Sequence, residues 1–170
     1  MTKELGYVKS NSKILEILEL NLALQKLRDN NETIGLCHGC FDVLHAGHIR
    51  YFEAARDLCD VLIVTITANK YVNKGKDRPV IHQDDRAFLV GALSCVDFVS
   101  ISHFSSAEVV IKNIQPALYF KGADYADTIN NPNSPIYKEK LLVENFGGKC
   151  CLIDELRDSS SAIIHRIRSS

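Results

Sequence analysis

The sequence predicts an α/β fold, in which a single domain holds a five-stranded parallel sheet with helices on both faces and carries an extra N-terminal helix. Short apolar runs alternate five times with helical patterns from about residue 33 onward, and a repeated strand–helix unit is typical of a parallel sheet with right-handed crossovers. Most of these runs are almost continuously apolar, as strands covered on both faces are. The length of 170 residues, of which 46% are hydrophobic and 24% charged, suits one globular domain.

The strands are expected in five apolar runs, which are Thr33–Cys37, Val61–Thr67, Asp97–Ile101, Ala117–Lys121 and Lys149–Ile153. The helices that follow them are expected at Gly47–Leu58, Gln83–Leu93, Ser106–Ile114, Tyr137–Phe146 and Ser160–Arg168. Two stop signals support these bounds. Phe146-Gly147-Gly148 ends a helix before the last strand, and Pro116 ends the helix before it.

Two segments stand outside this alternation. Asn11–Asp29 is expected to form the added helix, because large apolar residues fall on roughly one helical stripe: Ile14, Leu15, Leu18, Leu22 and Leu27. We expect this stripe either to pack on its own domain or to help build a subunit interface. The chain therefore divides into an N-terminal helical extension, residues 1–31, and a main domain, residues 32–170. Asp127–Pro135 is rich in turn formers and is predicted to be a mobile loop. Its part Asn130–Pro135 is expected to have almost nothing to bury.

The composition argues against several classes of protein. Lys and Arg number 20 against 21 Asp and Glu, a net charge of −1, which argues against a dedicated nucleic-acid binder. No apolar run reaches the roughly 18 residues of a membrane span, and the first residues lack the apolar block of a secretory signal. The six cysteines mostly lie inside apolar stretches and are predicted to be reduced. We therefore expect a cytoplasmic protein without a membrane or nucleic-acid partner.

The richest cluster of functional side chains follows the first strand, in the segment His38–His48. In an open parallel sheet, ligands bind beyond the carboxyl ends of the strands, so the fold places a ligand at this cluster. Gly39 allows a tight turn, and Gly47 lets a ligand approach the start of the next helix, whose free N–H groups suit a phosphate. His45 and His48 are three residues apart, so both rings are expected to face the bound anion.

These residues resemble a known family. His45-Ala46-Gly47-His48 matches the His-x-Gly-His signature of nucleotidyltransferases with a Rossmann-like fold. The longer segment Gly39–His48 is similar to the cytidylyltransferase-like branch, which includes glycerol-3-phosphate cytidylyltransferase and the heptose-phosphate adenylyltransferase domain. The resemblance covers about residues 33–168, and four further motifs follow in the family's order: Lys74–Val80, Asp85-Arg86, Lys121–Tyr125 and Ser159–Ser161.

The resemblance implies an enzyme in which an oxygen of a substrate phosphate attacks the α-phosphorus of a nucleoside triphosphate and expels pyrophosphate. No protein nucleophile is needed, so catalysis consists of positioning and charge stabilisation. The resemblance implies that His45 and His48 hydrogen-bond the phosphates in the transition state. It further implies that Lys74 closes over the triphosphate and that Arg86 steadies the pyrophosphate.

Further residues are implied to bind the nucleotide: Gly39, Cys40, Phe41, Gly47, Lys76, Lys121, Gly122, Ala123, Asp124, Ser159, Ser160 and Ser161. Among them, Ser160 and Ser161 would hold the β- and γ-phosphates at another helix N-terminus. Magnesium is expected as the cofactor, bound mainly through the nucleotide phosphates with no dedicated set of protein ligands.

The implied substrates are a nucleoside triphosphate, CTP or ATP, and a sugar or polyol phosphate. Arg78-Pro79-Val80 and Lys121–Tyr125 are more similar to the heptose-phosphate enzymes, so a heptose-phosphate-like acceptor is favoured. Glycerol-3-phosphate cytidylyltransferase is the alternative, although those enzymes carry an arginine where this chain has Asp154. The resemblance also implies a homodimer, because related nucleotidyltransferases are commonly dimers.

Other classes of function stay open at this point. Cys37-x-x-Cys40 and His45-x-x-His48 together supply four residues of the types that bind zinc, but only four residues separate the two pairs. A zinc finger has about a dozen residues between its pairs. The same two cysteines are the basis of a redox hypothesis. A third hypothesis is a non-catalytic module that binds nucleotides, which pyrophosphate release with a sugar phosphate would exclude.

Overall fold

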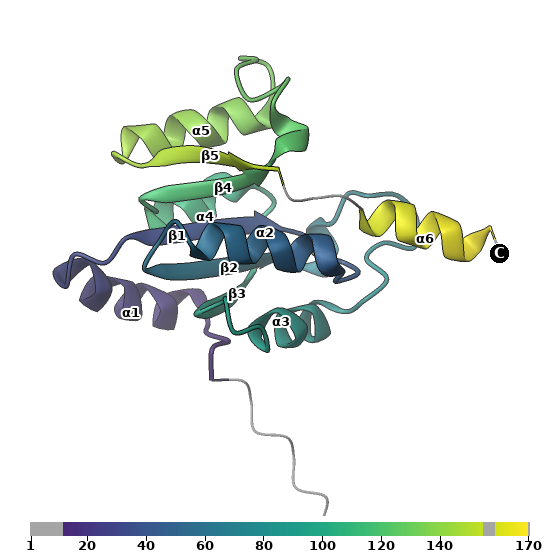
Figure 1. Ribbon diagram of the computed structural model, residues 1–170, viewed down its shortest axis with the longest axis horizontal. Helices are drawn as coiled ribbons and strands as arrows, with labels where there is room; N and C mark the ends of the chain where they lie inside the picture. The colour runs from purple at the N-terminus through teal and green to yellow at the C-terminus, as the bar shows by residue number, and fades with distance from the viewer. Residues whose placement is uncertain (1–11, 155–158, 170) are drawn as a thin grey trace, which may run out of the picture.

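The sheet has five parallel strands, as predicted. The structure, a computed structural model, describes residues 12–154 and 159–169. Its strands are β1 (Ile34–Gly39), β2 (Val61–Thr67), β3 (Phe98–Ser102), β4 (Leu118–Gly122) and β5 (Lys149–Ile153). They lie in the order β3-β2-β1-β4-β5 (Figure 1). The chain therefore moves outward in one direction from β1 to β3 and in the other from β4 to β5, which confirms the Rossmann-like fold and places the switch point between β1 and β4.

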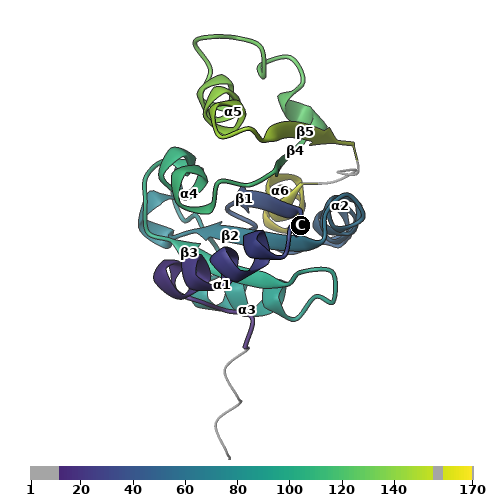
Figure 2. The same cartoon turned by 90° about the vertical axis from the view of Figure 1, so that its left-hand side faces the viewer.

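The helices cover both faces of this sheet. They are α1 (Ile17–Asp29), α2 (Ala46–Arg56), α3 (Gln83–Gly91), α4 (Ala107–Ile114), α5 (Pro135–Asn145) and α6 (Ser160–Arg168), with short 3₁₀ turns η1 (Asn69–Tyr71) and η2 (Ala123–Tyr125). Helices α2 and α3 pack against one face, and α1, α4 and α5 pack against the other (Figure 2). Helix α6 lies apart from the sheet, beyond the loops at one end (Figure 1).

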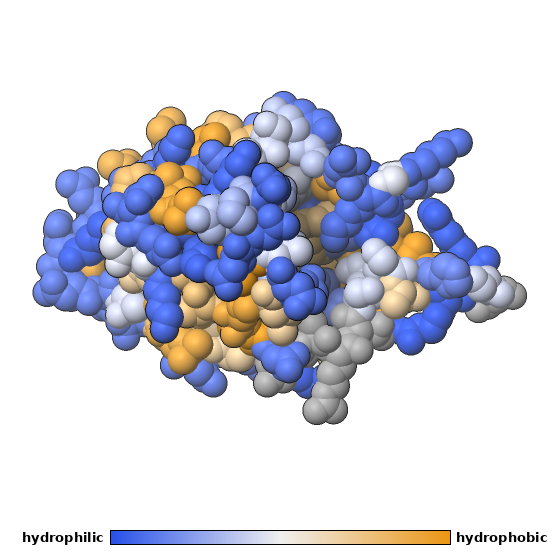
Figure 3. Space-filling model, turned by 90° about the horizontal axis from the view of Figure 1, so that it is seen from above, coloured by the Kyte–Doolittle hydropathy of each residue, from blue (hydrophilic) through white to orange (hydrophobic). Residues whose placement is uncertain are grey.

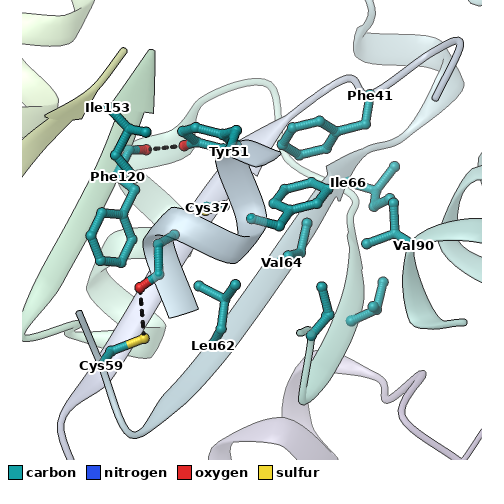
Figure 4. Close-up of a cluster of buried hydrophobic side chains, with 14 of the residues drawn as sticks. Cys37, Phe41, Tyr51, Cys59, Leu62, Val64, Ile66, Val90, Phe120 and Ile153 are labelled. Atoms are coloured by element: carbon teal, nitrogen blue, oxygen red, sulfur yellow. Dashed lines mark hydrogen bonds between the residues drawn. The ribbon is translucent and has the colours of Figure 1, made fainter. Parts of the chain in front are cut away.

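The two faces of the sheet build two apolar clusters, because neighbouring residues of a strand point in opposite directions. In β1, Leu36 belongs to the cluster under α1, α4 and α5, whereas Cys37 belongs to the cluster under α2 and α3, and both side chains are fully buried. In the cluster under α2 and α3, the Tyr51 hydroxyl donates a hydrogen bond to the carbonyl of Phe120 at 2.7 Å (Figure 4). This bond ties α2 to β4, the two elements that flank the switch point.

The added N-terminal helix is confirmed, but its predicted start and its predicted stripe are wrong. It begins at Ile17, not Asn11, because Glu16 and Glu19 form a capping box that starts the helix there. Ile14 instead pairs with Val99 in an isolated bridge at the edge of β3.

The buried stripe of α1 is carried by Leu20 and Leu24, which are both fully buried. Leu18 and Leu22 are 74% and 68% exposed. The pattern at 17, 20, 24 and 27 has the spacing of one helical face, whereas 18 and 22 fall on the opposite side. The helix thus packs on its own domain, and two large leucines remain on its outer surface.

The loop before α5 buries more than its composition indicates. Ile129 is only 8% exposed and packs in the cluster under α4 and α5, so the segment Asp127–Pro135 is anchored to the core just before Asn130–Pro135. Ser134 caps α5, which begins two residues earlier than predicted, and its hydroxyl also bonds the carbonyls of Thr128 and Asn131.

The face seen from above combines hydrophilic areas with several hydrophobic areas between them (Figure 3). The described helices include none that is long and apolar enough to cross a membrane. All six cysteines are free in the structure.

Candidate active site

A pocket lies at the carboxyl ends of β1 and β4, on either side of the switch point. Its walls come from the loop after β1, from α2, from the loop after β2 and from the end of β4. The lining residues are His38, Gly39, Cys40, Phe41, His48, Tyr51, Lys74, Lys121, Gly122, Asp124 and Tyr125. Eight of these are predicted site residues, so the fold brings together in one place segments that are far apart in the sequence.

The two signature histidines stack on each other at the start of α2. Their ring centroids are 3.9 Å apart, with 30° between the planes. His45 is the N-cap residue of α2, and its Nδ1 accepts a hydrogen bond from the backbone N–H of Gly47 at 3.1 Å. An imidazole nitrogen that accepts this bond carries no proton, so the neutral His45 ring carries its proton on Nε2. The helix cap thus fixes which nitrogen of His45 can donate.

His48 presents a buried polar atom that has no partner among the described residues. Its Nδ1 is buried and makes no hydrogen bond with any described residue. Burial, reinforced by His45 and Lys74, lowers the pKa of His48 to about 4, so its ring is neutral near pH 7. Buried polar groups in proteins are nearly always satisfied, and a bound ligand is the natural partner for this nitrogen.

Phe41 shapes the wall beside these histidines. Its backbone has a φ of 47°, in the left-handed region, and its ring meets His48 edge-on with centroids 5.3 Å apart. A Cβ added at Gly39 would lie only 3.0 Å from the Phe41 ring. A side chain at position 39 would therefore press on the Phe41 ring, which folds back over this glycine. Gly39 itself ends β1 and is not among the residues with positive φ, so the predicted tight turn does not occur at this residue.

Asp42 is a functional residue that the sequence reasoning missed. Its carboxylate is buried and accepts hydrogen bonds from Arg78 Nε at 2.6 Å and from the backbone N–H groups of Val80 and Ile81 at 2.8 and 3.0 Å. It thereby fastens the loop after β2 to the histidine loop. The available signal was the position of Asp42 inside the Gly39–His48 motif.

Arg86 does not line the pocket. Its side chain is 1% exposed, and its guanidinium donates to the carbonyls of Ile81 and Thr67 at 2.9 and 3.0 Å, to Asn69 Oδ1 at 2.8 Å, and to the carbonyl of Cys40. Each nitrogen of the guanidinium is thus bonded to the protein. The structure places Arg86 as a brace between the loops after β1 and β2, and not on the open face of the site.

The three serines at the start of α6 lie beside the histidine loop and Arg78. Ser159 caps the helix by accepting from the N–H of Ala162, and the buried Ser160 hydroxyl donates to the carbonyl of Val43 at 3.0 Å. Ser161 Oγ accepts a weak bond from Arg78 Nη1 at 3.4 Å. The first turn of α6 is thereby held against the histidine loop, with its N–H groups at that end.

Arg78 links this helix end to the buried carboxylate of Asp42. Its side chain is 7% exposed, and its Nη2 is buried with no hydrogen bond to any residue that the structure describes. A positive group with an unused donor thus lies at the N-terminus of α6. Both features favour an anion.

Lys121 is held in place by a second missed residue, Glu139 of α5. Lys121 Nζ lies 3.0 Å from Glu139 Oε2, and the same oxygen accepts a hydrogen bond from the Tyr119 hydroxyl at 2.8 Å. The ammonium also lies 5.1 Å from the centroids of the Tyr119 and Tyr125 rings. Nothing in the local pattern around residue 139 distinguishes it from an ordinary surface glutamate of an amphipathic helix.

The remaining predicted residues lie at different distances from the pocket. Lys74 lines it from an exposed loop, whereas Lys76 is exposed and Ala123 lies in η2, neither of them among the lining residues. In residues 12–154 and 159–169, no group of three or more His, Cys, Asp and Glu side chains is placed to hold a metal ion. Burial raises the pKa of the Cys37 thiol far above its usual range, which does not suit a zinc ligand, since zinc binds the thiolate.

Comparison with known proteins adds an independent line of evidence. The model of the family described as Cytidylyltransferase-like matches residues 36–166. The bifunctional protein HldE of Desulfatibacillum aliphaticivorans is 35% identical over 161 residues, which are 93% of this chain and 32% of that protein. The bifunctional protein HldE of a Nitratiruptor species is 36% identical over 92% of this chain and 32% of its own length. The chain spans about a third of the length of these relatives.

Solved structures agree on the fold. Pantoate-beta-alanine ligase from Francisella tularensis aligns with a TM-score of 0.61 and 20% identity, over 86% of this chain and 68% of the ligase. The lipopolysaccharide core biosynthesis protein from Thermoplasma volcanium aligns with a TM-score of 0.59 and 18% identity, over 75% of this chain and 99% of that one. At these identities the likeness concerns the architecture alone.

Proposed function

Because the chain belongs to the cytidylyltransferase-like family of nucleotidyltransferases, we propose that it transfers a nucleoside monophosphate from CTP or ATP to a phosphorylated sugar or polyol. The products are a nucleoside-diphosphate sugar or polyol and pyrophosphate. A heptose phosphate is the favoured acceptor, and glycerol 3-phosphate is the alternative.

One observation supports this reaction above the others, namely the stacked histidine pair at the N-terminus of α2. His48 Nδ1 is buried without a partner among the described residues, and Lys74 and Lys121 line the same pocket. A helix N-terminus and two ammonium groups attract a substrate that carries several phosphates, and the histidine pair adds directional hydrogen bonds to its oxygens.

In the proposed reaction, a phosphate oxygen of the acceptor forms a bond to the α-phosphorus, and the bond from that phosphorus to the pyrophosphate oxygen breaks. Charge builds on the phosphate oxygens in the transition state, so preorganised donors around them lower the barrier. His45 donates from Nε2, the positive end of the α2 dipole lies toward the α-phosphate, and Lys74 closes from its loop.

The leaving pyrophosphate is assigned to the first turn of α6. Ser159, Ser160 and Ser161 begin that helix, and Arg78 adds a positive charge with an unused donor, Nη2, among the described residues. Arg86 takes the role of a positioning residue, because it holds the loops after β1 and β2 while its donors are bound to the protein.

Magnesium is assigned to the nucleotide phosphates. Among the residues that the structure describes, the lining of the pocket contains a single carboxylate, Asp124, and magnesium is usually held by one or two carboxylates together with substrate phosphates. When bound, the ion would neutralise charge on the phosphate oxygens. The residues present therefore fit an ion that arrives with the nucleotide.

Two findings support the compartment and the acceptor that we propose. The six free thiols favour a reducing compartment such as the cytoplasm. The acceptor assignment rests on the motifs Arg78-Pro79-Val80 and Lys121–Tyr125, supported by 34–37% identity to several HldE proteins over about nine-tenths of the chain.

A screen of pyrophosphate release tests the proposal directly. The purified chain is incubated with each of four nucleoside triphosphates and magnesium, against a panel of sugar and polyol phosphates that includes a heptose phosphate and glycerol 3-phosphate. Release that needs both substrates and is lost in His48→Ala supports the enzyme. Nucleotide binding without release in any pairing would instead favour a non-catalytic module.

A further inference from the structure

The pocket has two adjoining hollows, and one histidine lies at their boundary. The hollow nearer α2 is lined by Phe41, His48, Gly122 and Asp124 among others, and the second hollow extends to Thr67 and Tyr71–Lys74 at the end of β2. Six residues line both hollows: His38, Gly39, Cys40, Lys74, Lys121 and Tyr125. A site with two compartments suits a reaction that joins two substrates.

His38 is held rigidly at this boundary. It lies near the end of β1, where it pairs in register with Thr65 of β2, and its Nδ1 is 2.9 Å from Thr65 Oγ1. Thr65 is itself buried. The other ring nitrogen makes no hydrogen bond with any described residue, while the ring lines both hollows. That nitrogen is therefore available to a ligand.

The ring of His38 is neutral, although Lys74 and Lys121 line the same two hollows. Burial, with a smaller contribution from Lys121, lowers the pKa of His38 to about 3. A neutral imidazole adds little attraction for a phosphate, which Lys74 and Lys121 on the same walls supply far better. It offers instead one directional hydrogen bond, the kind of contact that distinguishes one hydroxyl group from another.

We propose that His38 determines the specificity for the acceptor by hydrogen-bonding a hydroxyl group of the sugar in the second hollow. The acceptor phosphate then lies toward Lys74, Lys121 and the histidine pair. This inference rests on the proposed function and names the chemistry that its acceptor must have. The acceptor is a polyhydroxylated phosphate, one of whose hydroxyls lies within hydrogen-bonding distance of the outer nitrogen of His38. Thr65 is the positioning residue that fixes the ring.

A site built to hydrogen-bond a hydroxyl rejects the analogue that lacks it, because the polar group of the site is then left without a partner. The experiment therefore compares the intact chain with His38→Phe, which keeps a ring of similar size without ring nitrogens. The acceptors are a heptose phosphate and a series of its analogues that each lack one hydroxyl. The dissociation constant of each is measured by calorimetry, and kcat/KM is measured where turnover occurs.

We expect His38→Phe to weaken binding of the heptose phosphate by about 10–100-fold and to leave the nucleotide dissociation constant within about threefold. For the intact chain, one deoxy analogue should bind more weakly than the heptose phosphate, by the same factor that His38→Phe causes. His38→Phe should bind this analogue and the heptose phosphate equally. Thr65→Val, which removes the hydroxyl behind the ring, should show a smaller loss on the same analogue. His38→Ala replaces His38→Phe if the latter fails to fold.

The inference is overturned if His38→Phe ranks the deoxy analogues as the intact chain does, or if it weakens nucleotide binding as much as sugar binding. It is also overturned if the intact chain does not bind the heptose phosphate. Because binding is measured without turnover, a chain that binds the sugar and distinguishes its hydroxyls through His38, yet releases no pyrophosphate, contradicts the proposed function alone.

Discussion

At the scale of single residues, the two signature histidines have separable roles in stability and in catalysis. His45 caps α2 through Nδ1, so His45→Asn keeps an acceptor of the type preferred at an N-cap while it removes the Nε2 donor. We expect His45→Asn and His48→Ala to lower kcat by about 10²–10³-fold, the usual effect of losing one transition-state donor.

The same variants should melt close to the intact chain in a thermal scan, with His45→Asn the closer of the two because the cap survives. His103→Ala, which changes an exposed histidine after β3, is the matched control and should retain full turnover. Near-normal kcat in either signature variant would remove the histidine pair from the catalytic site.

His38 also predicts how stability depends on pH. Its pKa is about 3 in the folded protein against an ordinary value of 6.5, so between these values the unfolded chain binds more protons at this site. The free energy of unfolding therefore decreases as the pH is lowered from 6.5 towards 3, by at most about 1.4 kcal/mol per pH unit for one such group. Urea unfolding of His38→Phe across this range should show a shallower decrease than the intact chain. Parallel curves would show that the folded protein does not hold His38 neutral.

The buried carboxylate of Asp42 makes a third prediction at this scale. Asp42→Ala leaves Arg78 and two backbone N–H groups without their acceptor, and breaking a buried pair in this way costs about 3–5 kcal/mol. Asp84→Ala, whose carboxylate is 70% exposed beside His82, should change stability by less than about 0.5 kcal/mol. Urea unfolding compares the two, and a small loss in Asp42→Ala would mean that the loop after β2 holds its place without this anchor.

At the scale of elements, α1 shows how one helix divides its leucines between two environments. Leu20 and Leu24 are fully buried, whereas Leu18 and Leu22 are exposed. Leu20→Ala or Leu24→Ala should therefore lower the free energy of unfolding by about 2–5 kcal/mol, and Leu18→Ala or Leu22→Ala by less than about 0.5 kcal/mol. The four variants change the same residue type in the same helix, so equal losses in denaturant unfolding would contradict the packing of α1.

The order of the elements was predictable because each strand is a short apolar run with its own stop signals. The face of α1 was harder to predict, since leucines at 18, 20, 22 and 24 fit more than one helical stripe, and packing against the rest of the domain selects the one with Leu20 and Leu24. The histidine pair could be predicted because both residues lie within one turn of a helix.

Asp42, Glu139 and the bracing role of Arg86 depend on contacts between segments that are distant in the sequence. Glu139 meets Lys121 only because α5 packs beside β4 and β5, and Arg86 meets Cys40 only because α3 follows the loop after β2. Local periodicity carries no information about such pairs, whose formation depends on the tertiary fold.

At the scale of the whole molecule, the outer face of α1 bears on the predicted homodimer. The helix is held on its own domain by Leu20 and Leu24, yet Leu18 and Leu22, four residues apart, expose most of their side chains on the other side. Neighbours at this spacing form one continuous apolar surface on a helix. Such surfaces often mark an interface.

We therefore expect the protein to be a homodimer at micromolar concentration, with the outer face of α1 at the subunit contact. In light scattering, the intact chain should have twice the mass of its 19.0 kDa chain, and the double variant Leu18→Glu, Leu22→Glu should be a monomer with an unchanged melting profile. Leu141→Glu, at an exposed leucine of α5, controls for the added charge and should remain a dimer. A monomeric intact chain would reject the dimer. A double variant that still dimerises would place the interface on another surface, because burying these carboxylates against the same carboxylates of the second subunit is too costly.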